Sequence, residues 1–113
     1  MANIITINAR NTEVIQDTVV DETGAVYPLT GLLCFFIVKV DPEDNLPLIE
    51  VQAQNNDISS NIVIFRLTAD NTNVSPDTYF FEVIIMDTEL DSNFRRSVTT
   101  GSFIVKPSLD KDI

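Results

Sequence analysis

Short runs of β-branched and aromatic residues recur along this chain, and clusters of turn-forming residues separate them at close intervals. Valine, isoleucine, threonine and phenylalanine favour extended backbone, whereas aspartate, asparagine, glycine and proline favour turns. No stretch shows the 3.6-residue apolar period that is typical of a helix. The pattern predicts strands over residues 3–7, 12–20, 32–40, 47–54, 61–67, 78–86, 94–100 and 102–106, with Gly101 separating the last two. The chain is therefore predicted to be all-β.

The length of the chain limits how these strands can be arranged. Its 113 residues are enough for one domain with one modest core. Seven or eight short, mostly antiparallel strands in such a chain predict an immunoglobulin-like β-sandwich. We expect the sandwich to span residues 1–106, with an N-terminal strand or arm over residues 1–9 and a polar tail over residues 107–113.

Two local features refine this prediction. The segment 47–54 begins with proline, which cannot donate to a hydrogen-bond ladder, so we expect it at a sheet edge. Thr68 precedes a polar stretch and is expected to cap a single helical or 3₁₀ turn.

The charge of the chain limits its partners. Seventeen acidic side chains against seven basic ones give a formal charge of −10, yet the mean hydropathy is slightly positive at +0.13. Nucleic acid is not an expected partner, because a chain so acidic repels phosphates. The longest apolar run, residues 32–38, is too short to cross a bilayer, and the N-terminus lacks the features of a signal peptide. We therefore expect no membrane partner and a cytoplasmic origin.

Few residues offer catalytic or metal-binding chemistry. The chain has no histidine and a single cysteine, Cys34, so it has no His-activated nucleophile, internal disulfide or cysteine–histidine zinc site. Acidic residues gather in the loops 41–45 and 87–93, but neither loop has the glycine and terminal glutamate of a calcium-binding loop. We interpret both as solvated turns. The sequence predicts no catalytic, cofactor or metal site, and a protein that is not an enzyme.

Five segments, taken in order, resemble a known family. They are Arg10-Asn11-Thr12, residues 23–31 leading to Val38-Lys39, residues 67–72, residues 76–83 and residues 101–105. Together they resemble the small immunoglobulin-like domains of tailed-bacteriophage structural proteins, in particular the N-terminal domain of phage baseplate upper proteins. That family usually has glycine where Asn11 and Asp77 stand here, and both residue types tolerate the positive φ of such turns.

The resemblance implies a function. It implies a non-enzymatic structural protein of a phage virion, such as a capsid decoration, neck or tail and baseplate adaptor, which resides in the host cytoplasm before assembly. Its partners would be other virion proteins in a symmetric, multi-copy assembly. The alternative is a carbohydrate- or host-receptor-binding sandwich. Such modules usually expose tryptophan and tyrosine, and this chain has no tryptophan and two tyrosines.

Alignment with this family also implies which side chains face the core. The inward set is Cys34, Phe36, Val38, Val40, Val63, Phe65, Leu67, Tyr79, Phe81, Val83 and Ile85. The outward positions on the same strands are also apolar, unlike those of a sheet that faces water. They are candidates for a protein interface, together with the N-terminal arm, which would add a strand to a neighbour's sheet. These candidates are Ile4, Ile5, Ile7, Leu33, Phe35, Ile37, Ile62, Ile64, Phe80, Ile84 and Met86.

One alternative remains open for this apolar face. A shift of one residue in strand register, or a loop such as residues 41–47 folding over the sheet, would bury the same side chains within the chain.

Overall fold

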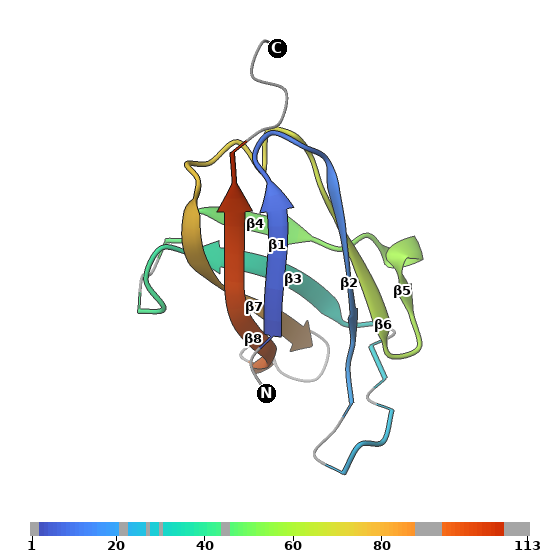
Figure 1. Ribbon diagram of the computed structural model, residues 1–113. Helices are drawn as coiled ribbons and strands as arrows, with labels where there is room; N and C mark the ends of the chain where they lie inside the picture. The colour runs from blue at the N-terminus through green and yellow to red at the C-terminus, as the bar shows by residue number, and fades with distance from the viewer. Residues whose placement is uncertain are drawn as a thin grey trace.

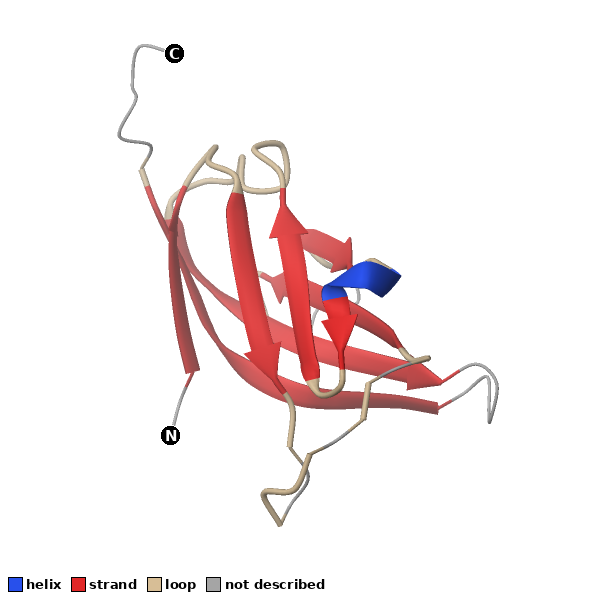
Figure 2. Cartoon of the chain, turned by 90° about the vertical axis from the view of Figure 1, so that its right-hand side faces the viewer, coloured by secondary structure: helices blue, strands red, loops and turns tan. Residues whose placement is uncertain are grey.

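Two β-sheets pack face to face in the computed structural model, which describes residues 3–20, 23–26, 28–29, 31–43, 46–87 and 94–107. The five-stranded sheet has the order β1 (Asn3–Asn8), β8 (Phe94–Lys106), β7 (Asp77–Asp87), β3 (Leu33–Lys39) and β4 (Ile49–Gln52). The three-stranded sheet has the order β2 (Glu13–Thr18), β6 (Ile62–Leu67) and β5 (Ile58–Ser59). A 3₁₀ turn, η1 (Asn55–Asp57), precedes β5. Figures 1 and 2 show the two layers from perpendicular directions.

This topology is that of an immunoglobulin-like β-sandwich, as the sequence predicts. Strands β2, β6 and β5 correspond to B, E and D of that fold, and β8, β7, β3 and β4 correspond to G, F, C and C′. All strand pairs are antiparallel except β1 with β8, which run side by side in parallel (Figure 1). The short strand β4 lies at a sheet edge, which confirms the expectation from Pro47.

Four phenylalanine rings form the centre of the core. Phe36 on β3 lies 5.5 Å from Phe81 on β7, 5.8 Å from Phe103 on β8 and 5.6 Å from Phe65 on β6, measured between ring centroids. All four rings are buried, and Phe65 belongs to the opposite sheet. Ring contacts therefore connect the two sheets at the place where antibody domains have a tryptophan and a disulfide.

The predicted inward set is confirmed with one exception. All of its members on β3, β6 and β7 are buried. Val40 is wrong, because β3 ends at Lys39 and the side chain of Val40 is exposed. The chain leaves the sheet at that point and the alternation of strand faces no longer applies.

A tyrosine corner fixes the start of β7. The hydroxyl of Tyr79 donates a 2.6 Å hydrogen bond to the carbonyl oxygen of Ser75, four residues earlier. This contact is a hallmark of the fold at this corner. Burial, followed by the charge of Asp77, raises the pKa of Tyr79 above its ordinary value.

The turn before β7 is held by side-chain hydrogen bonds. The Thr68 hydroxyl accepts from the Asn71 N–H at 3.1 Å, and the Thr72 N–H donates to the Thr68 carbonyl at 3.2 Å, so Thr68 caps a single turn. The fully buried Thr72 then donates its hydroxyl to the carbonyl of Asn11 at 2.6 Å. This contact joins the turn to the connection between β1 and β2.

Two expectations about local backbone are wrong. Strand β8 runs unbroken through Gly101, and its irregularity lies at Val98, which is passed over between the pairs Ser97↔Ile84 and Thr99↔Val83. Asn11 does not adopt positive φ either. In the connection between β1 and β2 that conformation belongs to Arg10 (φ 64°), and Asp77 is the first residue of β7.

Gly101 is needed where three strands meet. A Cβ atom at this position would overlap the backbone oxygen of Asn3 on β1 and lie 2.7 Å from Cε1 of Phe81 on β7. Gly101↔Phe81 and Asn3↔Gly101 are register pairs, so the ring of Phe81 and strand β1 occupy the space of the missing side chain.

We predict that Gly101→Ala destabilises the domain by about 1–3 kcal/mol, because the added methyl group must displace the start of β1 or the ring of Phe81. Urea denaturation followed by circular dichroism measures this difference. Ser102→Ala, on the other face of the same strand, is the matched control and should change stability little. Equal stability of the two variants would contradict this close packing.

Candidate protein-binding face

The outward-pointing side chains of β3, β7 and β8 form a surface that we call the outer face. Leu33, Phe35 and Ile37 on β3 lie opposite Met86, Ile84 and Glu82 on β7, and Phe80 lies opposite Lys39. On the other side of β7, Thr100 and Ser102 of β8 lie opposite Glu82 and Phe80. The register therefore brings the predicted outward residues of β3 and β7 together on one face.

The centre of the outer face is covered by its own neighbours. Ile37 and Ile84 point outward, but their side chains are only 8% and 2% exposed. Leu33, Phe35 and Met86 are half-buried, whereas Phe80 is 44% exposed. The outer face thus has an exposed ring at one side of a largely covered apolar centre.

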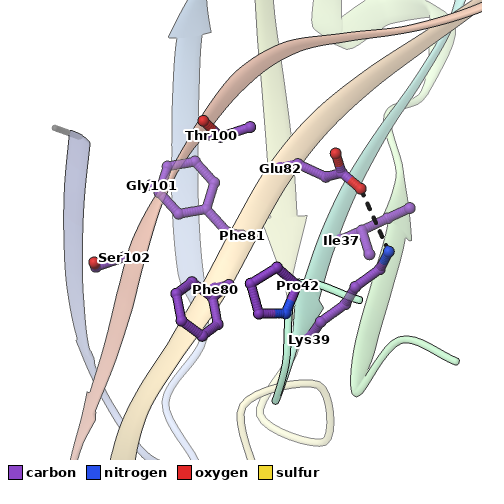
Figure 3. A pocket seen from close by; sticks show the side chains of 9 residues that line it. All are labelled: Ile37, Lys39, Pro42, Phe80, Phe81, Glu82, Thr100, Gly101 and Ser102. Atoms are coloured by element: carbon purple, nitrogen blue, oxygen red, sulfur yellow. Dashed lines mark ion pairs between the residues drawn. The ribbon is translucent and has the colours of Figure 1, made fainter. Parts of the chain in front are cut away.

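Two hollows flank this covered centre. The larger, of about 440 Å³, is lined by residues of β3, β7 and β8 together with Pro42 of the following loop (Figure 3). The smaller, of about 210 Å³, is lined by side chains including Phe35, Ile84 and Met86, with Pro47 from the other end of that loop. The loop after β3 therefore contributes a wall to each hollow. The alternative in which the loop 41–47 folds over the sheet and buries its apolar side chains thus applies in part.

A single ion pair crosses the larger hollow. The Lys39 ammonium lies 3.6 Å from a carboxylate oxygen of Glu82, and both side chains are mostly buried (Figure 3). Phe80 and Pro42 stand on one side of this pair, and the hydroxyl-bearing Thr100 and Ser102 lie across β7 from it. The hollow therefore combines apolar walls with a locally neutral charge pair and a polar rim.

Two of the predicted interface residues lie on the other sheet. Ile62 and Ile64 are on β6, in the three-stranded sheet, so they face away from the outer face and do not extend it. Both are half-buried. Alternation along β6 gives the correct direction relative to the core, but it does not say to which sheet the strand belongs.

Residues 3–8 do not form a free arm. Residues 3–8 are β1, which pairs in parallel with β8 along its whole length. Ile7 is buried in the core, Ile5 packs against the core, and Ile4 is exposed beside Ser102. The sequence predicts a strand or an arm here from its apolar residues; the strand is confirmed, and its pairing partner β8 lies at the far end of the sequence.

Several residues of the larger hollow were missed from the sequence. The predicted interface contains apolar residues alone, whereas the hollow is also lined by the polar side chains of Lys39, Glu82, Thr100 and Ser102. Thr100 and Ser102 are two residues apart, so they face the same side of a strand that continues through Gly101. The sequence predicts a break at Gly101, and across a break this spacing does not indicate a shared face.

Cys34 has no catalytic surroundings. Its thiol is fully buried on β3, and burial, with a smaller effect of Asp17, raises its pKa to about 11. A protonated, buried thiol is a poor nucleophile. Within the described ranges, no group of three or more His, Cys, Asp or Glu residues is placed to hold a metal ion. No helix among the described residues is long and apolar enough to cross a membrane.

The fold and this face define an immunoglobulin-like β-sandwich with a partly covered apolar outer face. No protein-family model matches the sequence, and no curated protein matches it. Among solved structures, the chain is similar to the extracellular domain of the voltage-gated sodium channel β4 subunit, described as a parallel homodimer in cell–cell adhesion. Identity is 13%, the TM-score is 0.39, and the match covers 95% of this chain and 91% of that one. A similarity at this level carries no inference about function.

We predict that the free energy of unfolding falls as the pH rises from about 9 to 11, by about 2 kcal/mol from Cys34. In this range the unfolded chain releases the thiol proton and the folded chain retains it, so the unfolded state is favoured. Urea denaturation at several pH values measures the slope. Cys34→Ala removes this contribution and should leave only the part due to tyrosine, whereas an unchanged slope would contradict it.

Proposed function

We propose that this protein is a non-enzymatic assembly module that binds another protein through the outer face. The observation that carries the proposal is the exposed ring of Phe80 beside the 440 Å³ hollow, on a face whose centre is already dry. Protein interfaces combine a desolvated apolar centre with a polar rim, and aromatic anchors contribute most of the binding energy. Ile37 and Ile84 supply the centre here, and Thr100 and Ser102 supply part of the rim.

We further propose, from the resemblance of five sequence segments, that the assembly is a bacteriophage particle, with other virion proteins as partners. The support is the order of those segments in a chain that folds as an immunoglobulin-like sandwich. In such a particle the chain would serve as a decoration, neck, tail or baseplate subunit. Repetition of one modest contact by symmetry would strengthen attachment through avidity.

A sugar-binding role has less support. Carbohydrate sites usually present exposed tryptophan or tyrosine rings, but the chain has no tryptophan, and Tyr79 is buried in the tyrosine corner. The other tyrosine, Tyr27, lies outside the described residues.

The test is composition of purified particles. Mass spectrometry of virions purified from cells that carry the phage encoding this chain should find it at a fixed ratio to the major structural proteins. Its absence from purified particles would overturn the virion proposal.

We predict that Phe80→Asp removes the chain from particles while the isolated domain keeps its fold, because Phe80 is 44% exposed and its replacement leaves no core cavity. Val26→Asp is the matched control, since Val26 is 57% exposed in the connection between β2 and β3, outside the outer face, and should not affect incorporation. Quantitative mass spectrometry measures incorporation, and thermal denaturation verifies folding. Normal incorporation of Phe80→Asp would assign binding to another surface.

A further inference from the structure

Strand β2 presents an open edge in the three-stranded sheet. It pairs with β6 on one side, and no strand of the described residues lies on the other. The Val19 N–H donates to the carbonyl of Asn61, just before β6, at 2.8 Å, so the backbone groups of Val19 point toward β6. In an antiparallel pair the backbone groups of successive residues point alternately toward and away from the partner strand. Glu13, Ile15 and Asp17 therefore face β6, whereas the N–H and C=O groups of Val14, Gln16 and Thr18 point away from the sheet.

Two of the other sheet edges, β4 and β5, are protected. β4 starts just after Pro47 and carries the charged Glu50 at an edge-facing position, and β5 has only two residues. Proline, a charged side chain and a very short strand each protect an edge from pairing with another chain. The edge-facing residues of β2 carry no charge and include Val14, which is 62% exposed. Beyond Thr18 the edge is closed, because Val20 forms a bridge with Val26. The open stretch is thus residues 14–18, centred on Gln16.

We propose that this edge binds the same edge of a second copy of the chain, in antiparallel orientation around a two-fold axis at Gln16. In this register Gln16 lies opposite Gln16 of the second copy, and Val14 lies opposite Thr18. All three edge-facing residues then exchange backbone hydrogen bonds in both directions. The two three-stranded sheets join into one continuous six-stranded sheet.

The charges on β2 select this register over its neighbours. With Gln16 on the axis, Asp17 lies opposite Ile15 and Glu13 lies opposite Val19, so no like charges face each other. A shift of the axis to Ile15 places Glu13 opposite Asp17, and a shift to Asp17 places two aspartates opposite each other. Directly opposed like charges destabilise a strand pair. The edge of β1 has similar length, but no charge there selects a register.

The net charge gives this dimer an unusual dependence on salt. Each copy carries −10, so long-range repulsion opposes association at low ionic strength. The edge itself is uncharged, so salt screens the repulsion without weakening the contact. We expect tighter dimerisation at about 500 mM than at about 50 mM sodium chloride, since the screening length falls several-fold. A basic partner docked on an acidic surface would show the opposite dependence.

Cysteine cross-linking tests the register directly. Opposed residues of a hydrogen-bonded antiparallel pair have Cα atoms about 5.5 Å apart, within the range that a disulfide bridges. Gln16→Cys should therefore form a disulfide-linked dimer with oxidised glutathione. In Thr18→Cys the two thiols would be separated by four residues along the strand, about 14 Å, which is too far for a disulfide. This variant should therefore run as a monomer in non-reducing gel electrophoresis. The native Cys34 is buried and should not react.

A proline variant tests the contact without cross-linking. The Gln16 N–H has no partner among the described residues, so Gln16→Pro removes no hydrogen bond of the folded monomer. It removes both backbone bonds at the axis of the dimer and should raise the dimer dissociation constant about tenfold or more, measured by sedimentation equilibrium. Gln52→Pro, at an equivalent edge-facing position of β4, is the matched control and should dimerise as the unmodified chain does.

The outcomes separate this proposal from the function of the outer face. Cross-linking of Gln16→Cys alone, with loss of dimer in Gln16→Pro, supports it even if Phe80→Asp shows that the outer face binds nothing. A monomeric unmodified chain at high salt and high concentration would overturn it. Cross-linking of Thr6→Cys in place of Gln16→Cys would also overturn it and assign the dimer to the edge of β1. Circular dichroism verifies that each variant is folded.

Discussion

The contact of Phe36 with three other rings is the constraint on which the rest of this structure depends. With a single cysteine, the chain has no internal disulfide to hold its two sheets together. Phe36 contacts Phe81 and Phe103 within its own sheet and Phe65 in the opposite sheet, at 5.5–5.8 Å between centroids. Aromatic pairs at such distances stabilise beyond the area they bury. Once Phe36 faces inward, its neighbours Phe35 and Ile37 must face outward, so the same ring cluster that builds the core also creates the apolar outer face.

The inward and outward directions of side chains were largely predictable, and the pairing of strands was not. Alternation has a period of two along a strand, so Cys34, Phe36 and Val38 were placed correctly from their spacing in the family alignment. Sheet membership depends on contacts between distant segments, which the local pattern does not encode. Ile62 and Ile64 were therefore assigned to the wrong face, although their direction relative to the core was correct.

The same distinction explains the errors at the two ends of the sandwich. A glycine such as Gly101 locally predicts a strand break, yet here it leaves space that the ring of Phe81 and the backbone of β1 occupy. Ile4, Ile5 and Ile7 are predicted to form an apolar arm that pairs with a neighbouring chain, yet they belong to β1, an edge strand that pairs with β8 of the same chain. In both cases the decisive neighbour is far away in sequence. The sequence of Thr68 and Asn71, by contrast, predicted its turn because all the partners are local.

The parallel pairing of β1 with β8 has a consequence for how the chain folds. Asn3 donates its side-chain amide to the carbonyl of Thr100, 97 residues away, so the first strand has no place in its sheet until nearly all the others have been synthesised. Closing so long a loop is entropically unfavourable and slows folding. During synthesis, the hairpin of β7 and β8 must form before β1 can dock. The first strand of this sandwich to be synthesised is thus the last to become part of it, and until it docks its backbone groups are available for pairing with other chains.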